Sequence, residues 1–460
     1  MSDFQVAGRR VVVVGAARSG VAAAELLARH GARVTLADLR PDLPDADRLR
    51  ASGVETELGP HRPETFAAAD LVVVSPGVPL RQPAIARARR ARVPVIGELE
   101  LASRLARGRI VAITGTKGKS TTTTLVGRML AAAGFDAPVV GNIGAPFAAR
   151  VDESTDRTIH VVEASSFQLE TTVTFHPWIA ALLNLSADHL DRHANLREYR
   201  AAKARVFANQ GEGDFAVINA DDAAAMRLAA RRVRAARRLF ALDRALDEGT
   251  VVAGGWVVSR SRGQADAPLV PVAEVKLIGR HLLSDVLAAA TVAALAGAPA
   301  EAIRAAVAGF EGLEHALEPA GTVGGVRFVN DSKATNVESA RRSIESFDRD
   351  VVPIVGGRFK GGDFRDLRPL VASRATAVVA IGESRALVRE ALADLVPVID
   401  AASMADAVRA ALAAAKPGGV VVLAPACSSF DMFRDYAERG RVFKQEVRKL
   451  VGERGGRREP

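Results

Sequence analysis

The chain has 460 residues, of which 48% are apolar and 25% charged, and this length predicts two or three domains rather than one core. Its formal net charge of +9 comes largely from scattered arginine, and with only two Trp and two Tyr for base stacking we expect no nucleic-acid role. No stretch has the ~20 apolar residues of a membrane span, no secretory signal is visible, and the single cysteine, Cys427, excludes an internal disulfide, so we expect a cytoplasmic protein.

The first region alternates apolar strand-like runs with helix-like runs, which predicts a parallel sheet covered by helices. The expected strands are 9–14, 33–38, 71–74 and 93–96. Residues 15–20 (Gly-Ala-Ala-Arg-Ser-Gly) resemble a dinucleotide fingerprint in which Ala17 replaces the middle glycine, and Asp38 ends the second strand where a ribose-binding acid could lie. The pattern indicates a nucleotide or phosphate ligand, although a turn without a ligand remains an alternative.

A second region opens with the strand 110–113, the loop 115–120 (Gly-Thr-Lys-Gly-Lys-Ser) and a helix expected over 121–133. A glycine-rich turn that leads into a helix directs backbone N–H groups and the helix dipole at an anion. Lys119 adds a positive charge and Ser120 a hydroxyl for Mg²⁺. We therefore predict a site for a nucleoside triphosphate; the alternative is a tight turn with a surface lysine.

Three further groups in this region are candidates for the same site. Glu163 ends the strand 159–163, so its carboxylate lies at the carboxyl edge of the sheet and could bind Mg²⁺, although an acid capping a helix is the alternative. Asp188 and His189 follow the strand 179–184. Lys203 lies on the apolar face of a helix, where it could be carbamylated by CO₂ into an anionic metal ligand or could extend to solvent.

A third region holds the strands 326–329, 351–355, 377–381 and 420–423. Loops rich in Lys, Ser, Thr and Gly follow three of them, at 330–336, 356–364 and 424–429, and indicate a site for a small anionic substrate. Cys427 is expected to be a buried apolar side chain rather than a nucleophile. The pattern divides the α/β chain into three domains, 1–97, 98–312 and 313–460, each a mostly parallel sheet flanked by helices, with a Rossmann-like first and last domain and a P-loop ATPase-like central domain.

Motifs along nearly the whole chain resemble the Mur ligases of peptidoglycan synthesis: residues 115–121, the Glu163 segment, Asp188-His189 and 199–203. Within that family, residues 165–170, 330–336 and 425–427 are similar to the member that adds D-glutamate to UDP-N-acetylmuramoyl-L-alanine. The resemblance implies an enzyme that supports cell shape and division: ATP phosphorylates the UDP-linked carboxylate, and the D-glutamate amine attacks the acyl phosphate. We expect a monomer with these two small-molecule substrates.

The resemblance also implies site residues, which follow by role. ATP would be bound by Gly115, Thr116, Lys117, Gly118, Lys119, Ser120, Thr121 and Asp331. Of two Mg²⁺ ions, one would be bound by Ser120 and Glu163 and the other by His189 and carbamylated Lys203; Lys119, His189 and Lys203 would be the catalytic residues. The UDP substrate would contact Ser19, Asp38, Leu39, Arg40, Gly77, Asn142, Ser165 and Gln168, and D-glutamate would contact Lys333, Thr335, Lys360, Ser429 and Tyr436.

The chain departs from the family pattern at four positions: Ala316, Leu282, Phe359 and Tyr436. The first two remove an arginine and an amide expected near the nucleotide, and we still expect an active ligase. Three other functions fit the motifs less well. A folate polyglutamate ligase would not explain residues 1–97, an NAD-dependent dehydrogenase would leave the 115–120 loop and Lys203 without a role, and a nonenzymatic nucleotide-dependent binding protein would not need three substrate-facing loops.

Overall fold

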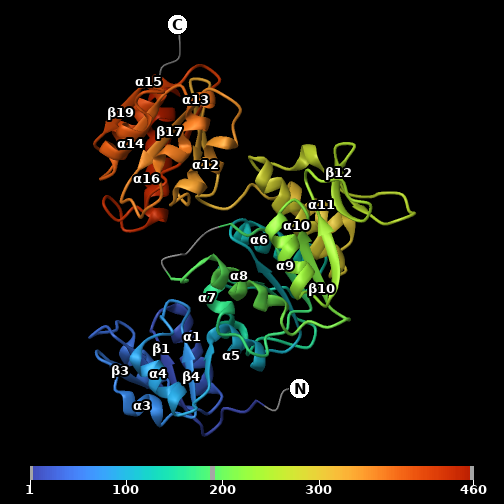
Figure 1. Cartoon of the computed structure of the whole chain (residues 1–460). Helices are drawn as coiled ribbons and strands as arrows, with labels where there is room; N and C mark the ends of the chain where they lie inside the picture. Colours follow the sequence, from blue (N-terminus) through green and yellow to red (C-terminus); the bar gives the residue numbers. More distant parts are fainter. Residues whose placement is uncertain (1–3, 187–191, 456–460) are drawn as a thin grey trace. The chain divides into compact units, whose positions relative to one another are not determined.

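The computed structural model describes residues 4–186 and 192–455, which form two compact units (Figure 1). The first unit comprises the chain up to Val275 together with Leu283–Gly309, and the second comprises Lys276–Leu282 and the chain from Phe310 onward. The first unit contains two sheets and the second contains one. No helix of the described ranges is long and apolar enough to cross a membrane.

The first sheet has the order β3-β2-β1-β4-β5, and all its strands are parallel. Its elements are β1 (Arg10–Val14), β2 (Arg33–Asp38), β3 (Val54–Leu58), β4 (Leu71–Val74), β5 (Val95–Gly97), α1 (Arg18–Arg29), α2 (Ala46–Ala51), α3 (Pro63–Ala67) and α4 (Pro83–Arg90). Both faces are covered, because alternate valines of β1 belong to different apolar clusters: Val11 and Val13 to one, Val12 and Val14 to the other. The strand order reverses between β1 and β4, so a crevice for ligands is expected beyond the carboxyl ends of these two strands.

The second sheet has the order β14-β13-β12-β11-β10-β9-β6-β8-β7. Its strands are β6 (Arg109–Thr114), β7 (Val139–Gly141), β8 (Ile159–Glu163), β9 (Ile179–Leu182), β10 (Phe215–Asn219), β11 (Ala236–Phe240), β12 (Gly249–Ala253), β13 (Trp256–Arg260) and β14 (Ala267–Pro271). The helical elements are α5 (Glu98–Leu105), α6 (Lys119–Ala132), η1 (Phe147–Arg150), α7 (Ser166–Leu169), α8 (Leu196–Ala204), η2 (Arg205–Phe207), α9 (Ala223–Arg232), η3 (Val272–Glu274), α10 (Arg280–Leu295) and α11 (Ala300–Ala308). Strands β6 to β12 are parallel, and the Gly-rich stretch adds the antiparallel strands β13 and β14 at one edge.

The third sheet has the order β15-β16-β20-β17-β18-β19, with only β15 antiparallel among them. Its strands are β15 (Glu318–Val323), β16 (Val326–Asn330), β17 (Val351–Gly356), β18 (Val378–Ile381), β19 (Val398–Ala401) and β20 (Val420–Leu423). Its helices are α12 (Val337–Glu345), η4 (Phe364–Leu367), α13 (Arg368–Arg374), α14 (Arg385–Leu392), α15 (Met404–Ala414) and α16 (Tyr436–Gly455). Apolar clusters lie on both faces of this sheet.

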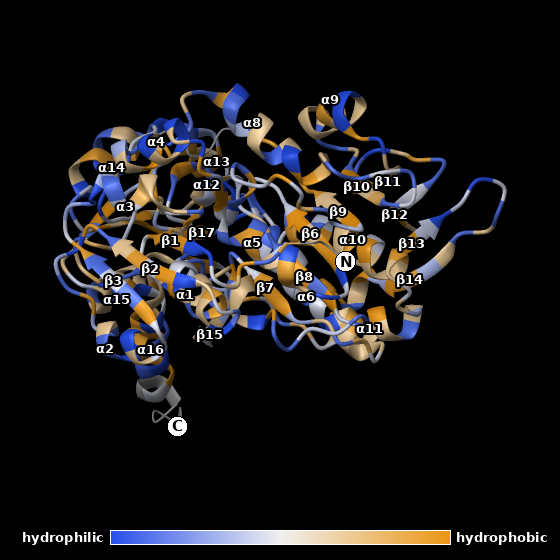
Figure 2. Cartoon of the chain, turned by 90° about the horizontal axis from the view of Figure 1, so that it is seen from below, coloured by the Kyte–Doolittle hydropathy of each residue, from blue (hydrophilic) through white to orange (hydrophobic). Residues whose placement is uncertain are grey.

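The expected class, three mostly parallel sheets flanked by helices, is confirmed. Figure 2 shows apolar residues along the strands and hydrophilic residues in the loops between elements, as sheets buried on both faces require. One local expectation is wrong: helix α6 begins at Lys119 rather than at Thr121.

Candidate active site

The loop between β6 and α6 is held in a conformation that requires glycine. Gly118 is the residue before α6 and has φ +84°, and a Cβ there would lie 2.1 Å from Oδ1 of Asp285. The side chain of Asn184 fixes the loop through two hydrogen bonds to the backbone of Lys117. Its Oδ1 accepts the Lys117 N–H at 2.8 Å, and its Nδ2 donates to the Lys117 carbonyl at 3.0 Å. The loop therefore presents the N-terminus of a 14-residue helix in a fixed orientation, which suits an anion.

Two lysine ammonium groups converge on one backbone oxygen of this loop. Nζ of Lys119 donates to the Gly115 carbonyl at 3.0 Å and to the Thr116 carbonyl at 3.0 Å. Nζ of Lys203, on α8, donates to the same Gly115 carbonyl at 2.7 Å. Lys203 is only 2% exposed, so the expectation that it faces inward is confirmed. Two like charges at one oxygen repel, and an anion beside them would relieve that repulsion.

Glu163 lies at the end of β8, which pairs with β6, and is 1% exposed. Its Oε1 accepts a hydrogen bond from Nδ2 of Asn142 at 2.7 Å, whereas its buried Oε2 has no hydrogen-bond partner in the described part of the chain. A buried carboxylate oxygen without a donor is costly. The arrangement suits a cation, which would satisfy this oxygen.

Other predicted members of the nucleotide site lie around this centre. Ser120 and Thr121 are in the first turn of α6, and Oγ1 of Thr116 lies 3.0 Å from the hydroxyl of Tyr199. Asp188 and His189 fall outside the described residues, so the structure says nothing of the proposed role of His189. Within the described ranges no group of three or more His, Cys, Asp or Glu side chains is placed to hold a metal ion.

The residues predicted for the UDP portion gather at the carboxyl edge of the first sheet. Ser19 lies in the first turn of α1, which begins at Arg18. Leu39, which is 58% exposed, and Arg40 follow β2. Oδ2 of Asp38 accepts the Ala16 N–H at 2.6 Å, and Oδ1 pairs with Nε of Arg40 at 2.9 Å. Desolvation raises the pKa of Asp38, but these hydrogen bonds outweigh it and hold the pKa at about 2. Asp38 thus braces the loop after β1, whatever else it binds.

Arg192 connects the loop after β4 to the region after β8, and no sequence motif indicated it. Its guanidinium donates to the Gly77 carbonyl at 3.1 Å and to the Pro76 carbonyl at 3.5 Å, and it lies 4.6 Å from the ring centroid of Phe167. The only sequence signal was an arginine three residues after His189.

Two residues predicted to contact the UDP substrate, Ser165 and Gln168, form the N-terminal cap of α7. Oγ of Ser165 accepts the Gln168 N–H at 3.2 Å, and Oε1 of Gln168 accepts the Ser165 N–H at 3.0 Å. Gln168 is 2% exposed and lines the cavity beside Arg192. The two side chains are therefore committed to fixing the start of the helix next to that cavity.

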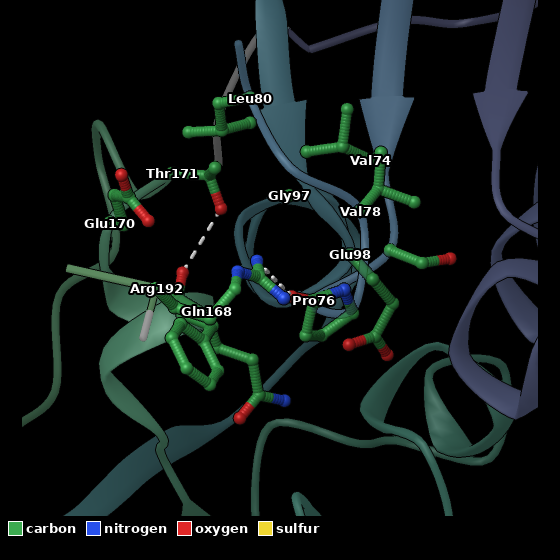
Figure 3. Close-up of a pocket in the computed structure, with 12 residues that line it drawn as sticks. Val74, Pro76, Val78, Leu80, Gly97, Glu98, Gln168, Glu170, Thr171 and Arg192 are labelled. Atoms are coloured by element: carbon green, nitrogen blue, oxygen red, sulfur yellow. Dashed lines mark hydrogen bonds between the residues drawn. The ribbon is translucent and has the colours of Figure 1, made fainter. Parts of the chain in front are cut away.

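The cavity beside Arg192 is shown in Figure 3. Its lining includes Ser75, Glu98, Gln168 and Arg192, and it encloses ≈ 10 Å³, about the space that one ordered water needs. Glu98 is 1% exposed; its Oε1 accepts the Ala148 N–H at 2.7 Å, and its Oε2 has no hydrogen-bond partner among the described residues. Desolvation by burial raises the pKa of Glu98 to about 7.

Glu100, two residues further along α5, is equally buried but has a different environment. Its carboxylate accepts hydrogen bonds from the N–H groups of Val173, Thr174 and Phe175 and pairs with Arg104. Desolvation works to raise its pKa, but the bonds from Thr174 and Val173 lower it below the usual value. Neither acid was recognised from the sequence; the signal was the pair of acids in a helix whose other early residues are apolar.

In the second unit, three loops meet beyond the carboxyl ends of β16, β20 and β17. The N–H of Ala426 donates to the Ala334 carbonyl at 2.9 Å, and Arg358 and Ser428 exchange backbone hydrogen bonds of 2.9 and 3.1 Å. Ser429 is buried, whereas Lys333 and Lys360 are exposed. The predicted D-glutamate residues therefore come from loops that touch one another, with both lysines accessible to an anion.

The remaining predicted residues of this unit have mixed positions. Thr335 is half-buried in the loop after β16, and Tyr436, which is 41% exposed, starts α16. Oδ1 of Asp331 accepts the Leu317 N–H at 3.3 Å. Cys427 is fully buried, so the expectation of a buried side chain is confirmed, and desolvation raises the pKa of its thiol to about 11.

The departures from the family pattern are explained locally at two positions. Leu282 is 7% exposed and belongs to an apolar cluster of the second unit, so this position is used for packing rather than for hydrogen bonding. Phe359 stacks on Phe364, with ring centroids 4.6 Å apart.

Three models of known families match the chain. They are "Mur ligase MurD-like, N-terminal domain" over residues 9–97, "Mur ligase middle domain" over residues 113–293, and "Mur ligase, glutamate ligase domain" over residues 317–427. A protein of Acidobacterium capsulatum named UDP-N-acetylmuramoylalanine--D-glutamate ligase is 47% identical over 96% of this chain and 97% of the relative. A protein of Geobacter metallireducens with the same name is 44% identical over 98% of this chain and 100% of the relative.

Solved structures agree at the level of the fold. A UDP-N-acetylmuramate-alanine ligase of Thermotoga maritima is 19% identical with a TM-score of 0.59, over 96% of this chain and 99% of that one. A MurF ligase of the same organism, in complex with ADP, is 16% identical with a TM-score of 0.60, over 98% of this chain and 96% of that one.

Proposed function

The chain belongs to the Mur ligase family, and from this premise we propose that it joins D-glutamate to UDP-N-acetylmuramoyl-L-alanine in an ATP-dependent reaction that passes through an acyl phosphate. The observation that carries the proposal is the convergence of Lys119 and Lys203 on the Gly115 carbonyl at the N-terminus of α6, in a chain whose relatives over nearly their full length bear the name of this ligase. The MurD-like match over residues 9–97 removes the support for a folate polyglutamate ligase.

The phosphates of ATP would lie at the N-terminus of α6, where backbone N–H groups of the 115–121 loop point at the anion. Lys119 would exchange its hydrogen bonds to the Gly115 and Thr116 carbonyls for phosphate oxygens and so offset their charge during transfer. The assignment of Asp331 to ATP rests on the family resemblance alone.

The residues present fit Mg²⁺ at this site. The unsatisfied Oε2 of Glu163 is a hard oxygen ligand, and Ser120 offers a second oxygen at the start of α6. We assign His189 and carbamylated Lys203 to a second ion. Bound Mg²⁺ would neutralise charge on the phosphoryl group as it moves between two anions.

Carbamylation of Lys203 would resolve an electrostatic conflict. The neutral amine would add CO₂ and release a proton, so that an anionic oxygen ligand replaces a buried cation beside Lys119. Lys203→Ala should be folded but nearly inactive, and acetate should partly restore its turnover by occupying the vacated space. The carbamate is detected by ¹³C NMR of the metal-loaded enzyme under ¹³CO₂, and its absence there would contradict this assignment.

The three regions would divide the substrates. Residues 1–97 would bind the UDP portion, 98–312 ATP, and 313–460 D-glutamate, with Asn142, Ser165 and Gln168 beside the UDP-linked chain. Lys333 and Lys360 would attract the two carboxylates of D-glutamate, and Thr335, Ser429 and Tyr436 would complete that site. We further propose that the enzyme acts as a monomer in the cytoplasm.

The experiment is phosphate release from ATP with Mg²⁺, UDP-N-acetylmuramoyl-L-alanine and, one at a time, D-glutamate, L-glutamate, L-alanine and L-lysine. We expect turnover only when the UDP substrate and D-glutamate are both present. Turnover with another amino acid in place of D-glutamate, or none with any, would overturn the proposal.

A further inference from the structure

Arg439, on α16, is the largest side chain in the described part of the protein that is almost completely buried, with 1% exposure. Its guanidinium makes three hydrogen bonds. Nη2 donates to the Ser332 carbonyl at 2.8 Å, Nε donates to Oγ of Ser332 at 2.9 Å, and Nη1 donates to the Cys427 carbonyl at 3.1 Å. One planar group therefore binds two chain segments that are almost a hundred residues apart.

These two segments are the loops after the neighbouring strands β16 and β20. Ser332 directly precedes Lys333, and Cys427 is two residues before Ser429. Lys333 and Ser429 are both proposed to bind D-glutamate. The loops are not held by regular sheet hydrogen bonds beyond Asn330 and Leu423, where the pairing of the strands ends. Their positions therefore depend on contacts outside the strand pairing. These include the Ala426–Ala334 and Lys333–His315 backbone hydrogen bonds, the exchange between Arg358 and Ser428, and the three hydrogen bonds of Arg439, whose side chain reaches both loops.

Burying the charged guanidinium of Arg439 costs free energy that a purely structural role does not require. None of its three acceptors is a carboxylate, and desolvation lowers the pKa of Arg439 to about 10, with Asp431 and Cys427 as the titratable groups that face it. An apolar side chain would fill such a position at less cost than a buried cation. What an apolar side chain could not do is bind both loops with a rigid planar fork.

We propose that Arg439 is a positioning residue, which holds the loops 330–336 and 425–429 in the geometry that binds D-glutamate. This inference rests on the proposed function. Arg439 does not touch the amino acid; it acts through Lys333 and Ser429. A buried cation behind the loops also adds positive potential to a site for an anion.

The test compares Arg439→Lys and Arg439→Ala with Arg448→Ala, a control on the exposed face of the same helix. Lysine keeps the charge but loses the fork. In Arg439→Lys we expect the KM for D-glutamate to rise on the order of 30-fold, with the KM values for ATP and the UDP substrate unchanged within about twofold. Added guanidinium chloride at millimolar, non-denaturing concentration should lower the KM for D-glutamate of Arg439→Ala and leave that of the lysine variant unchanged.

The outcomes separate the inference from the proposed function. If the wild-type enzyme shows no D-glutamate-dependent turnover, the proposed function is wrong. If the wild type is active and Arg439→Lys keeps its KM for D-glutamate, or raises the KM for all three substrates alike, the positioning role is wrong. If Arg439→Ala does not fold, the lysine variant decides alone. Arg448→Ala should match the wild type.

Discussion

Replacing Glu98 by glutamine should make the protein more stable at pH 8 and leave its stability nearly unchanged at pH 4.5. Glu98 is 1% exposed, and its Oε2 has no hydrogen-bond partner in the described part of the chain, so its ionised form is poorly solvated. Glutamine has nearly the same shape, keeps an oxygen for the Ala148 N–H and carries no charge at any pH. It therefore imitates the protonated acid.

The magnitude follows from the raised pKa. Burial moves the pKa of Glu98 from 4.5 to about 7, and since each pKa unit is worth ~1.4 kcal/mol, the difference corresponds to about 3 kcal/mol. The folded protein binds this proton more tightly than the unfolded chain does. The stabilisation from Glu98 is therefore fully present below pH 4.5 and is lost as the pH rises through about 7.

The assay is thermal and denaturant unfolding of wild type and Glu98→Gln at pH 4.5, 6, 7 and 8. A protein with two units need not unfold in one transition. The midpoints of the variants are therefore compared for the transition whose midpoint changes in Glu98→Gln. We expect the midpoint of the variant to exceed that of wild type at pH 8 by on the order of 5 °C and the two to converge at pH 4.5. All other titrating groups are common to both proteins, so they cancel in the difference.

Glu100→Gln is the matched control, because Glu100 lies on the same helix and is equally buried but has its pKa lowered. Its stabilisation is present above the unfolded pKa and is lost as the pH falls through the folded pKa. Removing its charge should therefore destabilise the protein at pH 8, by about 3 kcal/mol, because Arg104 would lose its buried partner. The reasoning is refuted if both glutamines shift stability in the same direction, or if Glu98→Gln gives the same difference at pH 4.5 and pH 8.

Three further changes test the phosphate and amino-acid sites. Lys119→Ala should lower kcat on the order of 10²-fold or more, because it removes charge stabilisation of the transferring phosphoryl group. Full activity in phosphate release would contradict the assignment of the 115–121 loop to the phosphates of ATP. Lys360→Ala should raise the KM for D-glutamate ~10-fold or more and leave the KM for ATP unchanged. Equal effects on the two KM values would mean that the amino-acid site lies elsewhere. Gly118→Ala should destabilise the protein by about 1–3 kcal/mol, since its φ of +84° and Asp285 both oppose a Cβ; an unchanged melting midpoint would contradict this.

The phosphate loop could be predicted because its signals are local. A strand, two glycines, a lysine and a helix follow one another within about twenty residues, and each has a conformational meaning by itself. Lys203 was also accessible to sequence reasoning, since its place on an apolar helix face predicted burial, which is confirmed. What the pattern did not show is that Lys119 and Lys203 would share the Gly115 carbonyl, because that contact joins α6 to a helix more than eighty residues later.

Glu98 and Arg439 could not be found in this way. An acid after a short strand and an arginine within a charged helix are ordinary in the sequence, and only tertiary packing buries them. The two residues differ in how the cost of burying a charged group is avoided or offset. Glu98 takes up a proton as the pH falls through about 7, whereas Arg439 keeps its charge and binds two carbonyl groups.

The convergence of the three C-terminal loops depends on strand order, which the sequence does not state. Strand β20 is the last in the chain but lies between β16 and β17 in the sheet. Its loop, 424–429, therefore lies between the loops of the other two strands and can bond to both, through Ala426 to Ala334 and through Ser428 to Arg358. Had β20 paired at the sheet edge, the same motifs would lie too far apart to bind one small amino acid. The sheet order thus turns three separate loops into one candidate site, and Arg439 reaches that site from behind.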